Sequence, residues 1–258
     1  MRPLGGPALP QAQLLERLAE RPIVYVGELH DQKKHHDIQL RILRGLRERG
    51  ATVALGMEMF HAEQQPALDR WVAGELEEAD FLEAVNWTET WGFDFELYRP
   101  LLDYARLHDV PVLALNVRRS LSRAVAESGV DGLSDELRAE LPEMDLEVEA
   151  HRTRFMAAMK EMGADQHPGM DLEKFYQAQV LWDEAMARAV AATMMADDSP
   201  EYMVVLAGRA HVEHALGIPQ RAARRGAEPF WIVLPVAAEG AEASAPGRAD
   251  FLWLTGRP

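Results

Sequence analysis

Residues 23–30 read Ile-Val-Tyr-Val-Gly-Glu-Leu-His, an apolar run that ends in residues able to do chemistry. Aliphatic and aromatic residues between Pro22 and Gly27 are typical of a strand that is buried on both faces, as strands of parallel sheets are. The pattern recurs, so we predict four such strands: Ile23–Gly27, Thr52–Met57, Pro111–Leu115 and Tyr202–Ala207. Helix-like stretches separate them. The chain is therefore predicted to be an α/β protein with a mainly parallel sheet flanked by helices.

The segment between the third and fourth predicted strands is far longer than the roughly dozen residues that a crossover needs. Most of it has helical apolar spacing, so we predict a mostly helical insertion there. The predicted organisation is an α/β core of residues 1–119 and 199–258 with an insertion subdomain of residues 120–198. Two more strands are expected after the fourth, at Pro229–Pro235 and at Phe251–Leu254, with the last of these at an edge of the sheet.

The helix that follows the first strand is predicted to begin with Asp31 as its amino-terminal cap and to end before Gly50. Its apolar residues recur with the spacing of a buried stripe. Of the two neighbouring histidines at its start, His35 is expected to be solvated on the polar face.

The composition excludes several classes of function. The 27 basic and 42 acidic residues give a net charge of −15, which repels a phosphate backbone, so we expect no nucleic-acid partner. The chain has no cysteine, which excludes disulfides, thiolate metal sites, a cysteine nucleophile and lipid attachment through an amino-terminal cysteine. No apolar run is long enough for a membrane span, and Met1–Pro10 lacks the pattern of a signal peptide. As written, the chain is expected to be cytoplasmic.

Polar residues follow each of the four predicted strands. Because ligands of open parallel sheets bind outside the carboxyl ends of the strands, these residues are predicted to converge on one site. Each of them alone is also explained as a strand terminator or helix cap, but the recurrence at four strands favours a site. The residues are Glu28, His30, Glu58, Asn116, Arg118, Arg119, Gly208 and His211.

Two kinds of chemistry remain open for this set. Imidazole and carboxylate groups suit a first-row divalent metal, with Glu28, His30 and His211 as ligands. They equally suit a metal-free general base that is oriented by a carboxylate. Glu58 lies in apolar company, where burial would raise its pKa and make it a proton carrier unless a cation compensates. A salt bridge from Glu58 to Arg118 or Arg119 is the structural alternative.

Several common catalytic motifs are missing from the sequence. There is no complete zinc-protease helix motif, no glycine-rich phosphate loop and no nucleophile elbow. Assignment as a peptidase, nucleotide-binding protein or serine esterase by motif alone is therefore disfavoured.

Five ordered motifs between Ile23 and Arg221 together resemble the ChaN-like haem-binding uptake family, which is grouped with the Tiki and erythromycin-esterase-like proteins. The motifs are Gly27-Glu28-Leu29-His30 with His36 and Gln39; Glu58-Met59-Phe60 followed by Gln65; Asn86-Trp87 with Trp91 and Tyr98-Arg99-Pro100; Asn116 with Arg118; and Gly208-Arg209-Ala210-His211-Val212. The resemblance implies an α/β core with a helical subdomain. It also implies either haem binding in iron acquisition or a metal-assisted or His/Glu-based hydrolytic site, with Glu28, His30, Glu58 and His211 as the central set. Proteins of this family are often exported, whereas this chain lacks a leader pattern.

Two functions follow as hypotheses. In the first, the insertion, which holds eight of the twelve methionines, lines a haem surface, and Tyr176, His151 or His167 ligates the iron. In the second, His30, Glu58 and His211 carry out hydrolysis, with or without a divalent transition metal, and Arg118 stabilises a developing oxyanion. The expected partner is haem or another small molecule, and a homodimer is the assembly to test.

Overall fold

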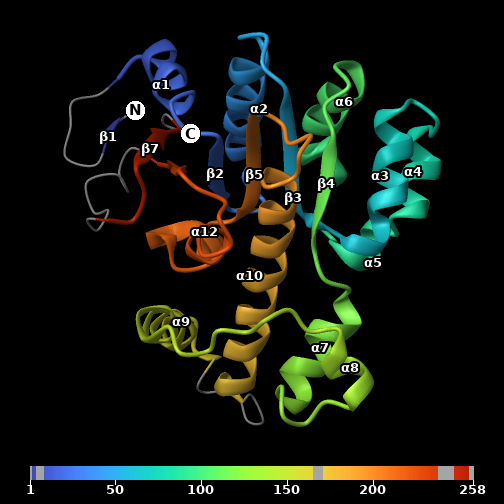
Figure 1. Cartoon of the computed structure of the whole chain (residues 1–258), viewed down its shortest axis with the longest axis vertical. Helices are drawn as coiled ribbons and strands as arrows, with labels where there is room; N and C mark the ends of the chain where they lie inside the picture. Colours follow the sequence, from blue (N-terminus) through green and yellow to red (C-terminus); the bar gives the residue numbers. More distant parts are fainter. Residues whose placement is uncertain (1, 4–8, 165–170, 238–246, 256–258) are drawn as a thin grey trace.

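The computed structural model describes residues 2–3, 9–164, 171–237 and 247–255, which form a sheet flanked by helices (Figure 1). The sheet has the strand order β1-β7-β6-β2-β5-β3-β4, and all neighbouring strands are parallel except β1 and β7, which are antiparallel. The predicted mainly parallel α/β fold with a helical insertion is thus confirmed. The strands are β1 (Arg2–Pro3), β2 (Ile23–Glu28), β3 (Val53–His61), β4 (Val112–Asn116), β5 (Tyr202–Gly208), β6 (Phe230–Val236) and β7 (Phe251–Leu254).

Alternate residues of each strand enter two different cores, which explains why the strands are continuously apolar. Val24 and Val26 pack with α1, α2, α3 and α6 on one face, and Ile23 and Tyr25 pack with α10 and α12 on the other. The helices are α1 (Gln11–Leu18), α2 (Lys33–Arg47), α3 (Gln65–Val72), α4 (Glu78–Ala84), α5 (Trp87–Thr90), α6 (Arg99–Leu107), α7 (Arg119–Ser128), α8 (Asp135–Ala139), α9 (Glu149–Glu161), α10 (Leu172–Met194), α11 (Arg209–Val212) and α12 (Ile218–Ala223), with short 3₁₀ turns η1 (Ala62–Gln64), η2 (Phe95–Leu97) and η4 (Glu213–Ala215).

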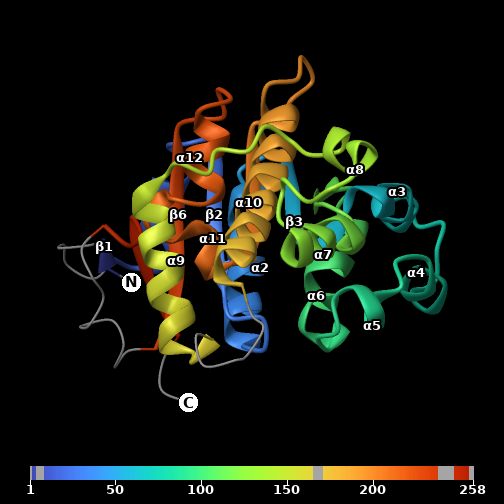
Figure 2. The same cartoon turned by 90° about the horizontal axis from the view of Figure 1, so that it is seen from below.

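Helix α10 joins the insertion to the sheet. Its carboxyl-terminal half, including Met186 and Val190, packs directly on the strands. Its amino-terminal half, including Ala178 and Leu181, packs with α7 beyond the carboxyl ends of the strands. In Figure 1 the helices α7, α8 and α9 lie below the sheet, and the view from below in Figure 2 shows α9 beside α10. The insertion is therefore placed next to the strand ends where the polar residues were predicted to meet.

Two local predictions are wrong. The cap of α2 is Gln32, without a capping side-chain hydrogen bond, while the Asp31 carboxylate accepts from the Gln32 side chain. Strand β7 is not the outermost strand of the described sheet, because β1 pairs with Phe251 and Leu252. Strand β1 has only two residues, which is too short for an apolar pattern to predict, so the pairing of β1 with β7 was missed.

The outer edge of β4 is closed by a side chain. The amide of Gln65, in the first turn of α3, donates from Nε2 to the Val112 carbonyl and accepts at Oε1 from the Ala114 N–H, both at 2.8 Å. These are the backbone groups that a further strand would use. None of the helices in the described part of the chain is long and apolar enough to cross a membrane.

Candidate functional site

The carboxyl ends of β2, β5, β3 and β4 lie side by side, as predicted, because these strands are consecutive in the sheet. Glu28, at the end of β2, is in register with Gly208, at the end of β5. Strand β3 continues past its predicted end, so Glu58 lies within it rather than after it. The strand ends thereby collect Glu28, Glu58, His30 and His211 in one place.

Glu28 is fully buried and is surrounded by hydrogen-bond donors. Its carboxylate accepts from the Tyr98 hydroxyl at 2.7 Å, from Gln39 Nε2 at 2.6 Å and from His30 Nδ1 at 2.8 Å, and His36 Nδ1 lies 3.5 Å away. Burial, together with the negative charge of Glu28, raises the pKa of Tyr98, which keeps this phenol a donor. A buried carboxylate is tolerated when its oxygens are satisfied in this way.

His35 was expected to face solvent, and the structure shows it buried instead. Its Nδ1 accepts the Leu29 backbone N–H at 2.9 Å. Burial and the neighbouring His36 lower the pKa of His35 to about 4, so the ring stays neutral and keeps the lone pair that this bond needs. His35 therefore fixes the turn that carries His30.

Glu58 and His211 form a buried ion pair at the floor of the site. His211 Nε2 lies 3.3 Å from Glu58 Oε1, and the Gly208 N–H donates to Glu58 Oε2 at 2.5 Å. Burial alone would raise the pKa of Glu58, but the charge of His211 and these hydrogen bonds lower it to about 2. Burial alone would lower the pKa of His211, but Glu58 and Asp183 raise it to about 10. The cation that compensates Glu58 is thus His211, and neither Arg118 nor Arg119 fills that role.

His30 is the member of this set that reaches solvent, with 28% of its side chain exposed. Its ring packs against Trp91 and Phe93, with centroid distances of 4.8 and 5.1 Å. A Cβ on Gly208 would lie only 3.0 Å from His30 Cε1, so the glycine allows the ring to rest on the backbone of β5. Burial alone would lower the pKa of His30, but its hydrogen bond to Glu28 and the charge of Glu58 raise it.

The two arginines that follow β4, Arg118 and Arg119, pair with other groups and not with Glu28, Glu58, His30 or His211. The Arg118 guanidinium makes two hydrogen bonds to Glu140, at 2.9 and 2.6 Å, and Arg119 donates to the Glu89 carbonyl. Asn116 has a supporting role, since its amide donates to the backbone carbonyl of Glu58 at 3.2 Å.

Asp183 of α10 is a member of the site that the sequence patterns did not indicate. It is fully buried, and its Oδ1 lies 2.7 Å from His211 Nδ1. Its Oδ2 lies 3.3 Å from His151 Nε2 on α9. The available signal was a pair of neighbouring acidic residues, Asp183 and Glu184, in the largely apolar stretch from Val180 to Val190.

Two of the three proposed haem ligands lie next to this aspartate. The rings of His151 and Tyr176 are 5.5 Å apart, and Phe155 packs against Tyr176 at the same distance. Tyr176 is fully buried, its hydroxyl has no hydrogen-bond partner in the described part of the chain, and burial raises its pKa to about 12. His167 lies outside the described residues.

The geometry does not support a metal centre. Within residues 2–3, 9–164, 171–237 and 247–255, no group of three or more His, Asp or Glu side chains is arranged to hold a metal ion. Both ring nitrogens of His211 face carboxylates, and a protonated imidazole has no lone pair to give to a metal.

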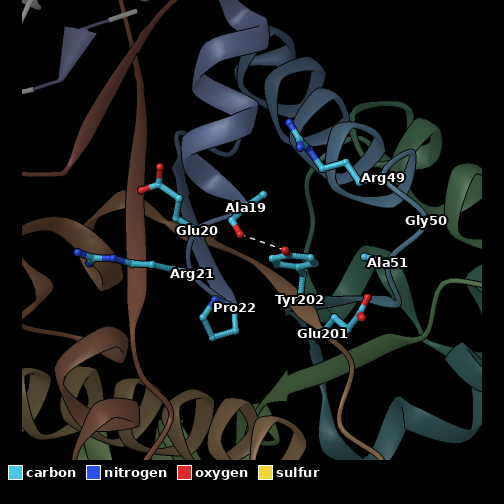
Figure 3. A pocket seen from close by; sticks show the side chains of 9 residues that line it. All are labelled: Ala19, Glu20, Arg21, Pro22, Arg49, Gly50, Ala51, Glu201 and Tyr202. Carbon is cyan, nitrogen blue, oxygen red and sulfur yellow. Dashed lines mark hydrogen bonds between the residues drawn. The ribbon is translucent and has the colours of Figure 1, made fainter.

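Two cavities lie at the opposite end of the sheet. A cavity of about 760 Å³ is lined by residues at the amino ends of β2 and β5, among them Pro22 and Tyr202, whose hydroxyl donates to the Ala19 carbonyl at 3.0 Å (Figure 3). A neighbouring cavity of about 620 Å³ is lined by Thr52, Pro111 and Asp198 among others. Neither contains a histidine, so we do not assign the chemistry there.

Comparison with known proteins identifies the family. The model of the family described as haem-binding uptake, Tiki superfamily, ChaN matches residues 14–222. The chain belongs to this family. A curated relative, the chloroplastic protein RETICULATA-RELATED 5 of Arabidopsis thaliana, is 25% identical over 261 residues, covering 93% of this chain and 35% of the relative. The chain therefore spans about a third of that relative's length.

Solved structures show the same fold at low sequence identity. ChaN of Campylobacter jejuni, whose structure was described for cofacial haem binding, has a TM-score of 0.75 and 16% identity, covering 96% of this chain and 93% of that one. A mutant of the erythromycin esterase EreC in its open conformation has a TM-score of 0.53 and 15% identity, covering 86% and 72%. The resemblance inferred from the sequence motifs is confirmed.

Proposed function

We propose that this member of the ChaN family is a metal-independent hydrolase whose site is the set at the strand ends. One observation carries this proposal. Two histidines at the same edge of the sheet each have Nδ1 bonded to a different buried carboxylate, His30 to Glu28 at 2.8 Å and His211 to Asp183 at 2.7 Å. A carboxylate on Nδ1 orients an imidazole, so that Nε2 is the nitrogen that exchanges a proton. In His211 this Nε2 also faces Glu58 Oε1, at 3.3 Å.

The different surroundings of the two histidines give them different roles. His30 is partly exposed and has one carboxylate, which it shares with Tyr98 and Gln39, so it is the base that takes a proton from water. The resulting hydroxide adds to the carbonyl carbon of an ester or amide, and the tetrahedral intermediate then collapses by breaking the bond between this carbon and the leaving oxygen or nitrogen. His211 is held as a cation by two carboxylates and is the proton donor for the leaving group, while Glu58 stabilises the charge of both rings.

The test uses 4-nitrophenyl esters and a fluorogenic peptide library with the dialysed full chain in the presence of EDTA. The His30→Ala, His211→Ala and double variants should lose activity to a similar extent, because residues that act as a unit are non-additive. His108→Ala is the matched control, since His108 is an exposed histidine at the carboxyl end of α6, the helix that precedes the amino end of β4. Additive losses, or no turnover of any probe by the parent, would rule out the shared hydrolytic site.

A second candidate, haem binding in iron or haem acquisition or handling, is favoured by the family match over residues 14–222. Tyr176, His151 and His167 remain the proposed ligands. Because Tyr176 is covered by Phe155, haem would reach it only if α9 moved away from α10. A homodimer is the assembly that we propose to test alongside haem binding.

Haem titration tests this candidate. We expect a saturable Soret shift with the parent protein and a weaker or displaced band for Tyr176→Phe, His151→Ala or His167→Ala, each made singly. Tyr202→Phe serves as the control, since Tyr202 lines the cavity at the opposite end of the sheet. Size-exclusion chromatography with and without haem would show whether dimers form. A parent protein without any Soret response would end the haem proposal.

A further inference from the structure

Asp183 places a negative charge in the middle of α10, beside a second fully buried carboxylate, Glu184, and among buried apolar residues. It is fully buried, as are Val180, Ala187 and Val190 on the same helix. A carboxylate in such surroundings is strongly destabilising unless its oxygens are matched by cations or hydrogen-bond donors. Asp183 Oδ1 lies 2.7 Å from His211 Nδ1 on α11. Asp183 Oδ2 lies 3.3 Å from His151 Nε2 on α9 but has no hydrogen-bond partner among the described residues, and burial lowers the pKa of His151.

The backbone is packed closely around this contact. A Cβ on Gly217 would lie 2.1 Å from the His211 carbonyl oxygen and 2.9 Å from Asp183 Oδ1. Beyond His151, Arg221 Nη2 lies 3.5 Å from Nδ1 of that ring. The carboxylate of Asp183 therefore has little room to take another position.

We propose that Asp183 is the positioning residue of His211: it accepts the Nδ1 proton and so turns Nε2 toward Glu58. The catalytic importance of this contact rests on the proposed hydrolytic function. The contact itself is a feature of the structure and does not depend on any substrate. The insertion would then contribute an essential part to a site whose other members lie at the ends of the sheet.

One neighbour offers a competing arrangement. The amide Nε2 of Gln179, one turn before Asp183 on α10, lies 2.9 Å from the same His211 nitrogen. An amide N–H needs a lone pair on Nδ1, whereas a carboxylate needs a proton there. The two partners therefore require opposite protonation of one atom, which makes the proposal testable without any activity.

The decisive measurement is ¹⁵N NMR of the full chain labelled on histidine. We expect His211 Nδ1 to be protonated at pH 7, and Asp183→Asn to weaken or abolish that signal. Asp183→Glu should restore part of it, and Gln179→Ala should leave it unchanged. An unprotonated Nδ1 in the parent, or a signal that depends on Gln179 and not on Asp183, would overturn the proposal. The parent spectrum decides the question even if Asp183→Asn does not fold.

Kinetics separate this inference from the function on which it rests. With the ester that the parent hydrolyses, Asp183→Asn should lower kcat by about 100-fold or more and change KM little, because substrate binding does not involve a residue buried behind His211. If the parent hydrolyses nothing while the NMR result holds, the proposed function fails and the positioning contact stands. An unchanged kcat for Asp183→Asn would show that the contact does not serve hydrolysis.

Discussion

Tyr98 shows how much of the site depends on a single hydroxyl. Its OH donates to Glu28 at 2.7 Å inside the core, and the ring packs beside His36. Tyr98→Phe removes this donor and keeps the ring. We expect a loss of about 1.5–3 kcal/mol in the free energy of unfolding, measured with urea, because hydrogen bonds to charged groups contribute that much. Tyr202→Phe removes a partly exposed hydroxyl and should cost less; equal losses would contradict the importance given to Glu28.

Gly208 tests how closely His30 must approach the backbone. Its φ of −52° suits any residue, so an added methyl acts through space alone. Because the new Cβ would lie 3.0 Å from His30 Cε1 and 3.6 Å from Glu58 Oε2, Gly208→Ala should displace the imidazole. We expect a shifted NMR resonance of His30 and at least a 10-fold loss of any hydrolysis, with a thermal midpoint close to that of the parent.

The control for this variant is Ala210→Ser, an exposed change in the same turn. It should leave both the His30 resonance and activity unchanged. If Gly208→Ala also leaves the His30 resonance and the activity unchanged, the close approach of His30 to the backbone is not required for function.

The strand ends could be predicted from the sequence, whereas several partners of the side chains could not. Glu28, His30, Glu58 and His211 follow apolar runs, and parallel strands collect such residues at one edge. Tyr98 and Asp183 meet them only through contacts between segments far apart in the chain. His35 was predicted to be solvated because its side chain is polar. The sequence does not reveal its hydrogen bond with the Leu29 N–H, which satisfies the ring nitrogen in the interior.

Among the elements, α3 protects the sheet through Gln65. Gln65→Leu would leave the outward-facing C=O of Val112 and N–H of Ala114, both buried residues, without hydrogen-bond partners. We expect a loss of about 1–3 kcal/mol in the free energy of unfolding and concentration-dependent self-association on size-exclusion chromatography.

Asp69→Ala is the matched control for this change. Gln65 also donates to Asp69 at 2.8 Å, so the control removes that exposed contact and keeps the two bonds to β4. The variant should remain monodisperse. Self-association of Asp69→Ala to the same degree would show that the closure of β4 is not the cause.

The helical character of α10 (Leu172–Met194) could be predicted as part of the mostly helical insertion. Its double role could not. Apolar spacing reports that a helix is buried, but not whether the sheet or other helices cover each turn. Residues of this helix belong both to the core under the sheet and to the cluster with α7.

For the whole molecule, the Glu58–His211 pair predicts a pH dependence of stability. Folding raises the pKa of His211 from 6.5 to about 10, so its contribution is complete below pH 6.5 and is lost as the pH rises through 10. Folding lowers the pKa of Glu58 from 4.5 to about 2, so its contribution is present above pH 4.5 and is lost as the pH falls through 2. The pair should stabilise the protein most between about pH 4.5 and 6.5.

Urea unfolding of the parent and of His211→Gln at pH 5.5, 8 and 9.5 measures this effect. The difference between the two proteins isolates His211 from other titrating groups, and it should shrink steadily toward pH 9.5. His108→Gln should show no such trend. A difference that is constant with pH would contradict the charged state of His211.

The contact of Asp183 with histidines from both α9 and α11 has a thermodynamic consequence. A ligand that binds between α9 and α10 and separates them would move His151 away from the Asp183 carboxylate. This would change the electrostatic environment of His211, which contacts the same carboxylate. Coupling free energies between two sites are reciprocal, so an occupant of the strand-end site would alter the affinity for that ligand by the same factor. Binding at the strand-end site and binding between α9 and α10 would then be coupled through the Asp183 carboxylate.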